Sequence, residues 1–445
     1  MTNPSSPPPW PVPEQRSPGQ IEQDRAAVQR QVDILSQRDD DRQNPVLTRI
    51  SVRAARAGQQ FDYLSQPAPA GPVLPRQNEL VVEASDDQLS RAGLRGYTEA
   101  ARPTRRTAGR RTRVLRVSAK TPAELLAEVK RLRNQKIKAN INPLVPLGYV
   151  VKGDAFPALS TGPGRFAAAA TDPSVRVAIV DTGRTAENRT DGWFTGVLAK
   201  DIDPLDVVEP KNRNDYFSGH GSFTAGIVRQ VSPTCEVMVY RFTGNDGLGT
   251  DAEAADVLLE AAAEAGDRRL IINASFGAPA VDGVPPLALQ EAVERIATDH
   301  PEVLIVASAG NNSTTDRFYP AGFDEFGVKA VGALNEDLSG ADFSNRGDWV
   351  HCSTVGVGVV STFVKGTLPP EPGFPIPDMQ FPADAWATWS GTSFTAPQIS
   401  GAVAHLCTQD PELTPKAAFD QLIADRTTLD EFGAVVHLLH GTPID

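Results

Sequence analysis

Short apolar runs alternate with longer amphipathic segments over most of the chain beyond Gly164. The runs are too short for buried helices, and the segments between several of them carry apolar residues at helical spacing. This alternation predicts an α/β fold, in which a parallel sheet is covered by helices on both faces. The expected strands are 175–180, 235–240, 270–273 and 303–307, and the expected helices include 251–264 and 286–298.

Polar residues follow these expected strands at the point where each one ends. Asp181 follows the first run, Asn273 closes the third, and Gly310-Asn311 comes just after the fourth. Ligands of such sheets bind at the carboxyl ends of the strands. We therefore expect a functional site at this edge of the sheet.

The N-terminal third has a different pattern. A Pro-rich beginning is followed by one expected amphipathic helix, and Pro67–Pro72 has the composition of a linker. The next stretch predicts strand, helix, strand, helix and strand, an order that suits a small ferredoxin-like α+β sandwich. Thr121-Pro122 gives the second of these helices a typical cap and first residue. The expected division is a flexible N-terminus over 1–75, an α+β domain over 76–150 and an α/β domain over 151–445. The helix of the N-terminus is expected at 19–42. The elements of the α+β domain are expected at 79–83, 86–94, 112–118, 121–132 and 137–141.

Charge and cysteine content exclude some classes of protein. The net charge is −12 and the pI is about 5.1, which disfavours a dedicated nucleic-acid-binding protein. An Arg-rich run over 102–116 lacks interleaved aromatic residues and is interpreted mainly as a solvated loop, with a nucleic-acid or membrane patch as the less favoured alternative. Three widely spaced cysteines do not form a disulfide framework. The beginning lacks the pattern of a signal peptide and no apolar run is long enough to span a bilayer, so a cytoplasmic location is expected.

Four residues indicate acyl-transfer chemistry. Ser393 follows a Ser-Gly-Thr turn and precedes an expected helix from Ser393 to about Cys407, where free backbone N–H groups favour negative charge. His220 is flanked by glycines, opens a helix of small residues, and is a natural general base. Asp181 could orient an imidazole, and the amide of Asn311 could donate to an oxyanion. Taken singly, each also fits a structural role as a helix cap, turn residue or core histidine.

Together these stretches resemble the subtilisin-like serine proteases, or subtilases. The order Asp, His, Ser, with Gly-Asn between His and Ser, is that of the family, and the resemblance covers about 145–425. It implies that Asp181 orients His220, that His220 is general base and then acid, that Ser393 attacks the peptide carbonyl, and that Asn311 stabilises the oxyanion. Phe223 and Phe394 stand where relatives often carry histidine and methionine, and neither is needed by the triad.

The resemblance also implies how substrate binds. In the family the substrate lies as an extended strand between two segments of the enzyme. Phe318 would make the pocket for the residue before the scissile bond shallow and favour a modest side chain there. The expected substrate-binding residues are Gly247, Leu248 and Gly249 on one side, Ser275, Phe276 and Gly277 on the other, and Ser308, Ala309, Gly310 and Phe318 in the pocket.

The α+β domain resembles the propeptide of the family, an intramolecular chaperone and inhibitor. The resemblance implies that 142–150 fills the cleft, and we expect cleavage after a residue between Leu144 and Lys152. A permanent accessory domain is the alternative. A Pro-rich insertion at 363–386 is expected near the site, as a rigid surface loop, a gate or a contact for a partner.

No cofactor is expected, and no acidic loop indicates a calcium site, although structural calcium is common in the family. Protein or peptide substrates and the chain's own N-terminal domain are the expected partners, without nucleic acid or membrane. Two other functions stay open: a non-catalytic peptide-binding scaffold with this fold, and another Ser-triad hydrolase, which would usually carry the G-x-S-x-G motif that is missing around Ser393.

Overall fold

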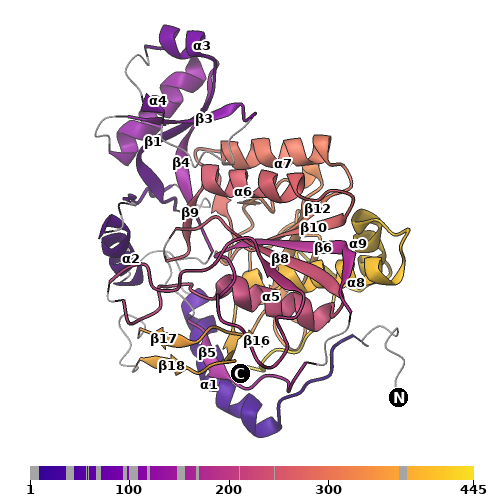
Figure 1. Cartoon of the computed structure of the whole chain (residues 1–445). Helices are drawn as coiled ribbons and strands as arrows, with labels where there is room; N and C mark the ends of the chain where they lie inside the picture. The colour runs from indigo at the N-terminus through magenta and orange to yellow at the C-terminus, as the bar shows by residue number, and fades with distance from the viewer. Residues whose placement is uncertain are drawn as a thin grey trace.

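A computed structural model gives the fold of the chain (Figure 1). It describes residues 10–36, 45–56, 58, 60–66, 72–93, 98–99, 109–117, 121–147, 156–166, 170–209, 211–244, 246–369 and 378–444. The expected linker at Pro67–Gly71, the arginines at 102–106 and part of the expected cleavage region, 148–152, lie outside the described residues. We call residues 10–36 the N-terminal arm, residues 72–147 the N-terminal unit and residues 156–444 the C-terminal unit.

A sheet of nine strands forms the centre of the C-terminal unit. Every neighbouring pair is parallel except the short pair at one edge. The predicted parallel α/β architecture is therefore confirmed. In spatial order the strands are β20 (Thr428–Leu429), β21 (Gly433–Val435), β15 (Cys352–Val355), β14 (Lys329–Leu334), β12 (Leu304–Ser308), β10 (Arg269–Ala274), β6 (Asp172–Asp181), β8 (Cys235–Arg241) and β7 (Val197–Ala199).

Helices cover both faces of this sheet (Figure 1). The first turn of α6 is fixed by a capping box, in which Thr250 accepts from the N–H of Glu253 and the Glu253 side chain accepts from that of Thr250. The buried central strands β6, β10 and β12 are rich in Val, Ile and Ala, as strands covered on both faces require. One face carries α6 (Asp251–Ala263) and α7 (Leu287–Asp299), the other α5 (His220–Val231) and α8 (Ala396–Gln409), and α9 (Pro415–Ile423) packs against α8.

The N-terminal unit is the predicted small sandwich. Its strands lie in the order β2-β3-β1-β4, all neighbours are antiparallel, and α4 packs on β1 and β4. The sheet does not end with β4, because this strand pairs with β9 (Leu248–Thr250) of the C-terminal unit. The elements are β1 (Pro75–Glu83), α3 (Asp86–Arg91), β2 (Thr98–Glu99), β3 (Thr112–Arg116), α4 (Pro122–Asn134) and β4 (Lys138–Pro146).

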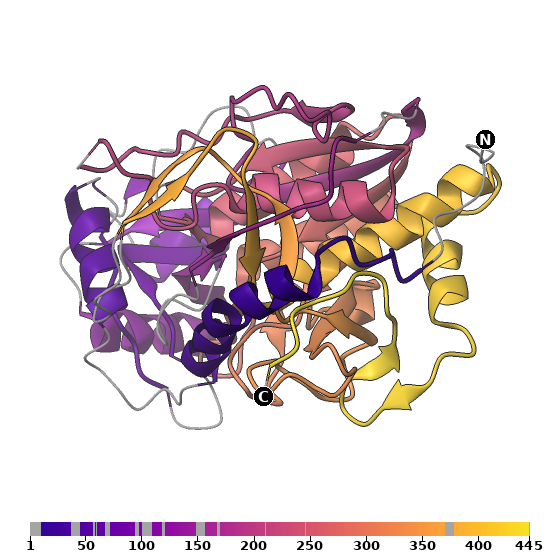
Figure 2. The same cartoon turned by 90° about the horizontal axis from the view of Figure 1, so that it is seen from below.

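Among the described residues, two helices precede this unit, where one was expected. Helix α1 (Pro18–Leu35) begins at a Ser17 capping box and ends earlier than the predicted Arg42. Helix α2 (Pro45–Arg56) was not predicted, and its buried Ile50 and Ala54 belong to the core of the C-terminal unit. Seen from below, the N-terminal arm crosses the C-terminal unit beside the C-terminal segment (Figure 2).

Short elements complete the C-terminal unit. The expected insertion at 363–386 contains a two-stranded hairpin, β17 (Gly366–Leu368) with β18 (Met379–Phe381), and ends in β19. Three strands, β5 (Ala158–Ser160), β16 (Val359–Thr362) and β19 (Trp386–Trp389), form a second antiparallel sheet. The remaining elements are β11 (Ala278–Pro279), β13 (Phe318–Tyr319) and the 3₁₀ turns η1 (Asp324–Phe326) and η2 (Thr392–Phe394).

Candidate active site

Asp181 and His220 are joined at the carboxyl edge of the large sheet. Asp181 is the last residue of β6 and His220 the first of α5, and both side chains are buried. The Nδ1 atom of His220 lies 2.9 Å from Oδ1 and 2.8 Å from Oδ2 of Asp181. This contact fixes the orientation of the ring and leaves Nε2 as its second nitrogen for chemistry.

A further carboxylate, Asp203, holds the two segments that carry this pair. Its Oδ2 accepts from the hydroxyl of Thr182 at 2.8 Å and from the N–H of Gly219 at 2.8 Å. Burial raises the pKa of Asp203 to about 6, and the charge of Asp181 adds to the effect. Asp203 was not among the predicted site residues, because it stands in a loop with no motif.

Ser393 precedes the helix, although it was predicted to open it. It belongs to the 3₁₀ turn η2, and helix α8 begins only at Ala396. The turn follows Gly391, whose φ of 150° favours glycine. The hydroxyl of Ser393 donates to the carbonyl oxygen of Leu147 at 3.1 Å and lies 3.3 Å from that of Ser275. Within the described ranges no hydrogen bond joins Ser393 to His220, so the hydroxyl faces the N-terminal unit.

Asn311 stands beside the nucleophile turn. Its Oδ1 accepts from the N–H of Thr392 at 2.9 Å and from the hydroxyl of Thr392 at 2.8 Å. These two bonds fix which end of the amide faces Thr392. They leave the Nδ2 group as the donor that an incoming oxyanion would meet.

The end of the N-terminal unit occupies the cleft at these residues. Strand β4 pairs with β9 in antiparallel register, with Leu144 opposite Thr250, Val145 opposite Gly249 and Pro146 opposite Leu248. The N–H of Leu147 then donates to the carbonyl of Gly247 at 3.3 Å. Residues 144–147 therefore lie against the predicted segment 247–249 as a peptide substrate would.

The predicted pocket surrounds Leu147 and is nearly filled. Leu147 is buried, and the cavity that remains beside it has a volume of only about 10 Å³. Phe318 packs so closely that a Cβ on Gly277 would come within 2.3 Å of its ring. The predicted residues Phe276, Gly277, Ser308, Gly310 and Phe318 line this space; Ala309 is buried, and its carbonyl accepts from Asn345.

Aromatic side chains surround the imidazole of His220. The rings of Trp389 and Phe394 each lie 5.3 Å from it, and Phe223 packs on both at 5.6 Å and 4.7 Å. Phe363, at the root of the insertion, contacts Trp389 at 6.2 Å. The insertion therefore lies next to the site, as expected. Phe223 and Phe394 complete an apolar wall that limits access of water to the imidazole.

A second contact between the two units involves the Arg-rich run. Buried Glu291 of α7 accepts from the N–H of Arg111 at 2.5 Å, from the N–H of Thr112 at 2.8 Å and from its hydroxyl at 2.6 Å. The side chain of Arg110 is only 1% exposed and binds Asp256 of α6 at 2.6 Å. Arg110 and Thr112 therefore pack between the units, which differs from the expected solvated loop, whereas the side chain of Arg111 stays about half exposed.

Helix α2 makes a third contact near the cleft. Arg53 donates to both carboxylate oxygens of Asp246 and to Asp215. Asp246 precedes Gly247, whose carbonyl accepts the hydrogen bond from Leu147, so α2 supports the side of the cleft formed by 247–249.

The three cysteines are free and buried. Among the described residues no helix is long and apolar enough to cross a membrane.

Comparisons with known proteins agree with this geometry. The model of the subtilase family of peptidases matches residues 172–436, more than half of the chain. The chain is 29% identical over 247 residues to a thermophilic serine proteinase of Bacillus sp. (strain AK1), covering 52% of each. It is 26% identical to subtilisin DY of Bacillus licheniformis, covering 58% of this chain and 85% of that protein. An intracellular serine protease of Paenibacillus polymyxa is also 26% identical, with 56% and 73% covered.

A solved structure shares the fold over most of the chain. Fervidolysin from Fervidobacterium pennivorans, described as a keratinolytic enzyme related to subtilisin, aligns with a TM-score of 0.55 at 18% identity, covering 86% of this chain and 63% of that one. The chain spans about half the length of the thermophilic proteinase that it matches. The family match over residues 172–436, together with the shared fold, shows that the chain belongs to the subtilase family of serine peptidases.

Proposed function

We propose that the protein is a serine endopeptidase whose N-terminal unit holds it inhibited until the bond after Leu147 is cut. One observation carries the proposal: the carbonyl oxygen of Leu147 accepts a hydrogen bond from the hydroxyl of Ser393, at the end of a strand paired with β9. A backbone carbonyl at the nucleophile is what a substrate presents. The family membership and the Asp181–His220 contact support the same chemistry.

In the proposed reaction Ser393 Oγ forms a bond to the carbonyl carbon while its proton passes to Nε2 of His220. Asp181 stabilises the resulting imidazolium, and the Nδ2 group of Asn311 donates to the oxyanion. The C–N bond then breaks, and the departing amine takes the proton from His220. Water, deprotonated by His220, releases the acyl group and restores Ser393.

The hydroxyl must turn for this reaction to begin, since it now faces Leu147 and Ser275. A rotation about χ1 of Ser393 exchanges these acceptors for His220. Such catalytic hydrogen bonds are often formed only in the reactive complex. The intact set of Asp181, His220, Asn311 and Ser393 favours an enzyme over a peptide-binding scaffold.

Pocket shape supports a preference for Leu-sized residues before the scissile bond. The ring of Phe318 closes one side, and Leu147 nearly fills the remaining space. A large aromatic residue would need Phe318 to move.

Mass spectrometry of the purified chain tests the proposal. Active protein should show a new N-terminus at Gly148, and the Ser393→Ala protein should keep 147 and 148 joined. A fluorophosphonate should label Ser393, and casein should be cleaved in preference to simple esters. An active enzyme with an intact 147–148 bond would make the N-terminal unit a permanent accessory domain. Absence of both labelling and cleavage would favour the scaffold.

We also propose a cytoplasmic location. Three free, buried cysteines and the relative named as an intracellular serine protease support it. A cytosolic peptidase needs restraint, which the N-terminal unit would supply. Fractionation of host cells followed by detection of the protein tests this location, and recovery outside the cell would contradict it.

A further inference from the structure

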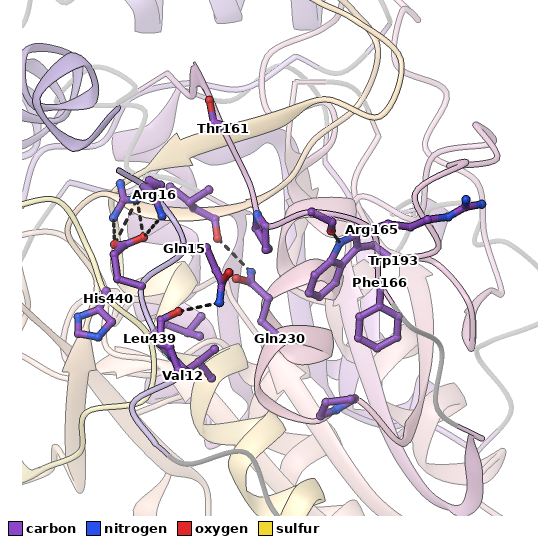
Figure 3. Close-up of a pocket in the computed structure, with 16 residues that line it drawn as sticks. Val12, Gln15, Arg16, Thr161, Arg165, Phe166, Trp193, Gln230, Leu439 and His440 are labelled. Carbon is purple, nitrogen blue, oxygen red and sulfur yellow. Dashed lines mark hydrogen bonds and ion pairs between the residues drawn. The ribbon is translucent and has the colours of Figure 1, made fainter. Parts of the chain in front are cut away.

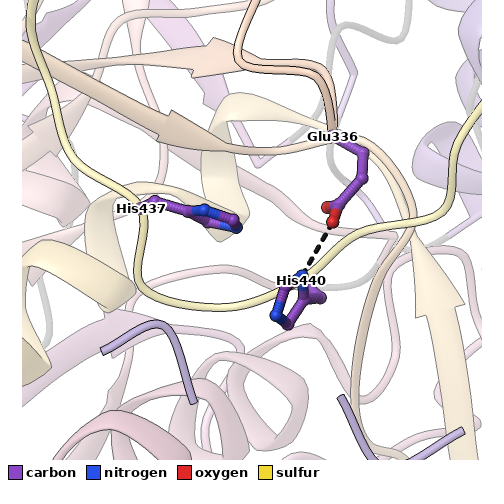
Figure 4. Close-up of side chains that lie close together, drawn as sticks. All are labelled: Glu336, His437 and His440. Atoms are coloured by element: carbon purple, nitrogen blue, oxygen red, sulfur yellow. Dashed lines mark hydrogen bonds and ion pairs between the residues drawn. The ribbon is translucent and has the colours of Figure 1, made fainter. Parts of the chain in front are cut away.

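Two imidazoles and one carboxylate meet away from the catalytic cleft. Glu336 stands in the turn after β14, while His437 and His440 stand in the segment that follows β21. One ligand atom from each lies within 4.8 Å of the other two (Figure 4). More than ninety residues separate Glu336 from the histidines, so the fold alone brings them together.

An ion pair explains only part of this cluster. The Nδ1 atom of His440 lies 2.7 Å from Oε1 of Glu336, and Oε2 accepts from the N–H of Gly441 at 2.5 Å. His437 packs edge-on against the His440 ring, with centroids 4.9 Å apart. Its Nε2 is buried and has no hydrogen-bond partner among the described residues. A buried polar atom without a partner is costly unless something binds it.

The donor set fits one class of ligand. Imidazole nitrogen with carboxylate oxygen suits zinc, whereas calcium prefers oxygen ligands throughout. Bonds of about 2.0 Å at tetrahedral angles place ligand atoms about 3.3 Å apart, so side-chain rotation must close the widest separation by about 1.5 Å. The three side chains are partly exposed, which gives them room to rotate and gives water access to a fourth position.

We propose that Glu336, His437 and His440 bind a zinc ion that joins the segment after β21 to the turn after β14. This site is independent of the proposed proteolysis, since none of its residues touches the triad. The site was not predicted, because the His-x-x-His spacing is short and the carboxylate comes from a distant turn.

The position of the site gives the ion a structural role. Arg16 of the N-terminal arm donates to the carbonyl of Gly441 at 2.6 Å and to the hydroxyl of Thr442 at 2.9 Å. Arg16 and His440 both line a cavity of about 410 Å³ beneath the arm (Figure 3). Thr442 in turn bonds to the carbonyls of Val357 and Gly358. Zinc would therefore hold the segment that ties the arm to the turn before β16.

Zinc titration of the full chain tests the proposal. The protein carries Ser393→Ala to prevent self-digestion, has no polyhistidine tag, and is stripped with a chelator before Zn²⁺ is added in competition with a chromophoric chelator. We expect one zinc bound per chain and a higher melting temperature. His437→Gln and Glu336→Gln should each weaken binding by at least about 100-fold, since even changes behind metal ligands cost 10–100-fold.

His300→Ala is the matched control, because it removes another partly exposed histidine and should leave zinc affinity unchanged. Two substituted positions guard against a variant that fails to fold, and circular dichroism checks each protein. Absence of zinc binding to the parent, equal affinity of the parent and both ligand variants, or binding of Ca²⁺ as tight as that of Zn²⁺ would each overturn the proposal.

Discussion

Glu291→Gln is the most informative change at the contact between the two units. The substitution keeps the volume of the side chain but replaces one of two acceptor oxygens by a donor. Oε1 of Glu291 accepts from the part-buried N–H of Arg111, and Oε2 accepts twice from Thr112 in a buried contact. In the variant at least one of these donors must lose its acceptor, whichever way the new amide turns.

The expected loss follows from these bonds. A buried donor left without a partner costs about 1–3 kcal/mol, and the bonds that remain lose an ionised acceptor. We expect docking of the N-terminal unit to weaken by about 3 kcal/mol, a factor of about 100 in the equilibrium constant. Glu294→Gln is the matched control one turn along α7. Glu294 is 43% exposed and binds only the Arg111 side chain, so its loss should cost less than about 1 kcal/mol.

Hydrogen exchange of the full Ser393→Ala chain measures the effect. Glu291→Gln should speed exchange about 100-fold at Arg111 and Thr112 and also in residues 247–250, which pair with β4 far from the substitution. Faster exchange at Arg111 and Thr112 alone would mean local fraying. Equal exchange of 247–250 in both variants would refute the claim that Glu291 holds the inhibitory strand in the cleft.

Three other changes test the site and its supports. Burial raises the pKa of Asp203 from 3.8 to about 6, so folding favours its protonated form and this contribution to stability is lost as the pH rises from about 4 to about 6. As the pH rises over this window, the free energy of unfolding of Asp203→Asn should increase by up to about 3 kcal/mol relative to that of the parent. Urea unfolding measures this difference, and a difference that is constant with pH would contradict the argument. Phe318→Ala should raise kcat/KM for Phe over Leu before the scissile bond at least about tenfold in a peptide library, and an unchanged ratio would show that another group closes the pocket. Gln31→Ala should lower stability by about 2 kcal/mol in denaturant, because Gln31 bonds Ser390 and the carbonyl of Thr388. Gln23→Ala, at an exposed position of the same helix, should have almost no effect, and equal losses would place the cause elsewhere.

The parts that follow from local pattern were predictable. Apolar runs such as 175–180 give buried strands in any parallel sheet, and the order of Asp181, His220 and Ser393 is a family motif. The first half of β4 was also predictable, as the expected strand 137–141, whereas its extension to Pro146 depends on pairing with β9.

Features that depend on distant partners were not predictable. Helix α2 places Ile50 and Ala54 against the C-terminal unit and leaves Val52 exposed, so its docking depends on a partner far along the chain. Asp203 and Glu291 are ordinary acidic residues until the fold buries them against backbone N–H groups. Glu336 and His437 lie about a hundred positions apart, and nothing local connects them.

The N-terminal arm changes what a single cut would achieve. The arm is fastened near Ser390 and Gly441, while the N-terminal unit docks at the opposite end of the C-terminal unit (Figure 1). A break after Leu147 would leave two chains that stay bound to each other, because the N-terminal arm and α2 still hold the first chain on the C-terminal unit. As long as the arm stays bound, the N-terminal unit would rebind as if it were on the same chain, and dilution would have little effect. Lasting activation would need a second break between α1 and β1, so the timing of proteolysis would be set by two severed bonds instead of one.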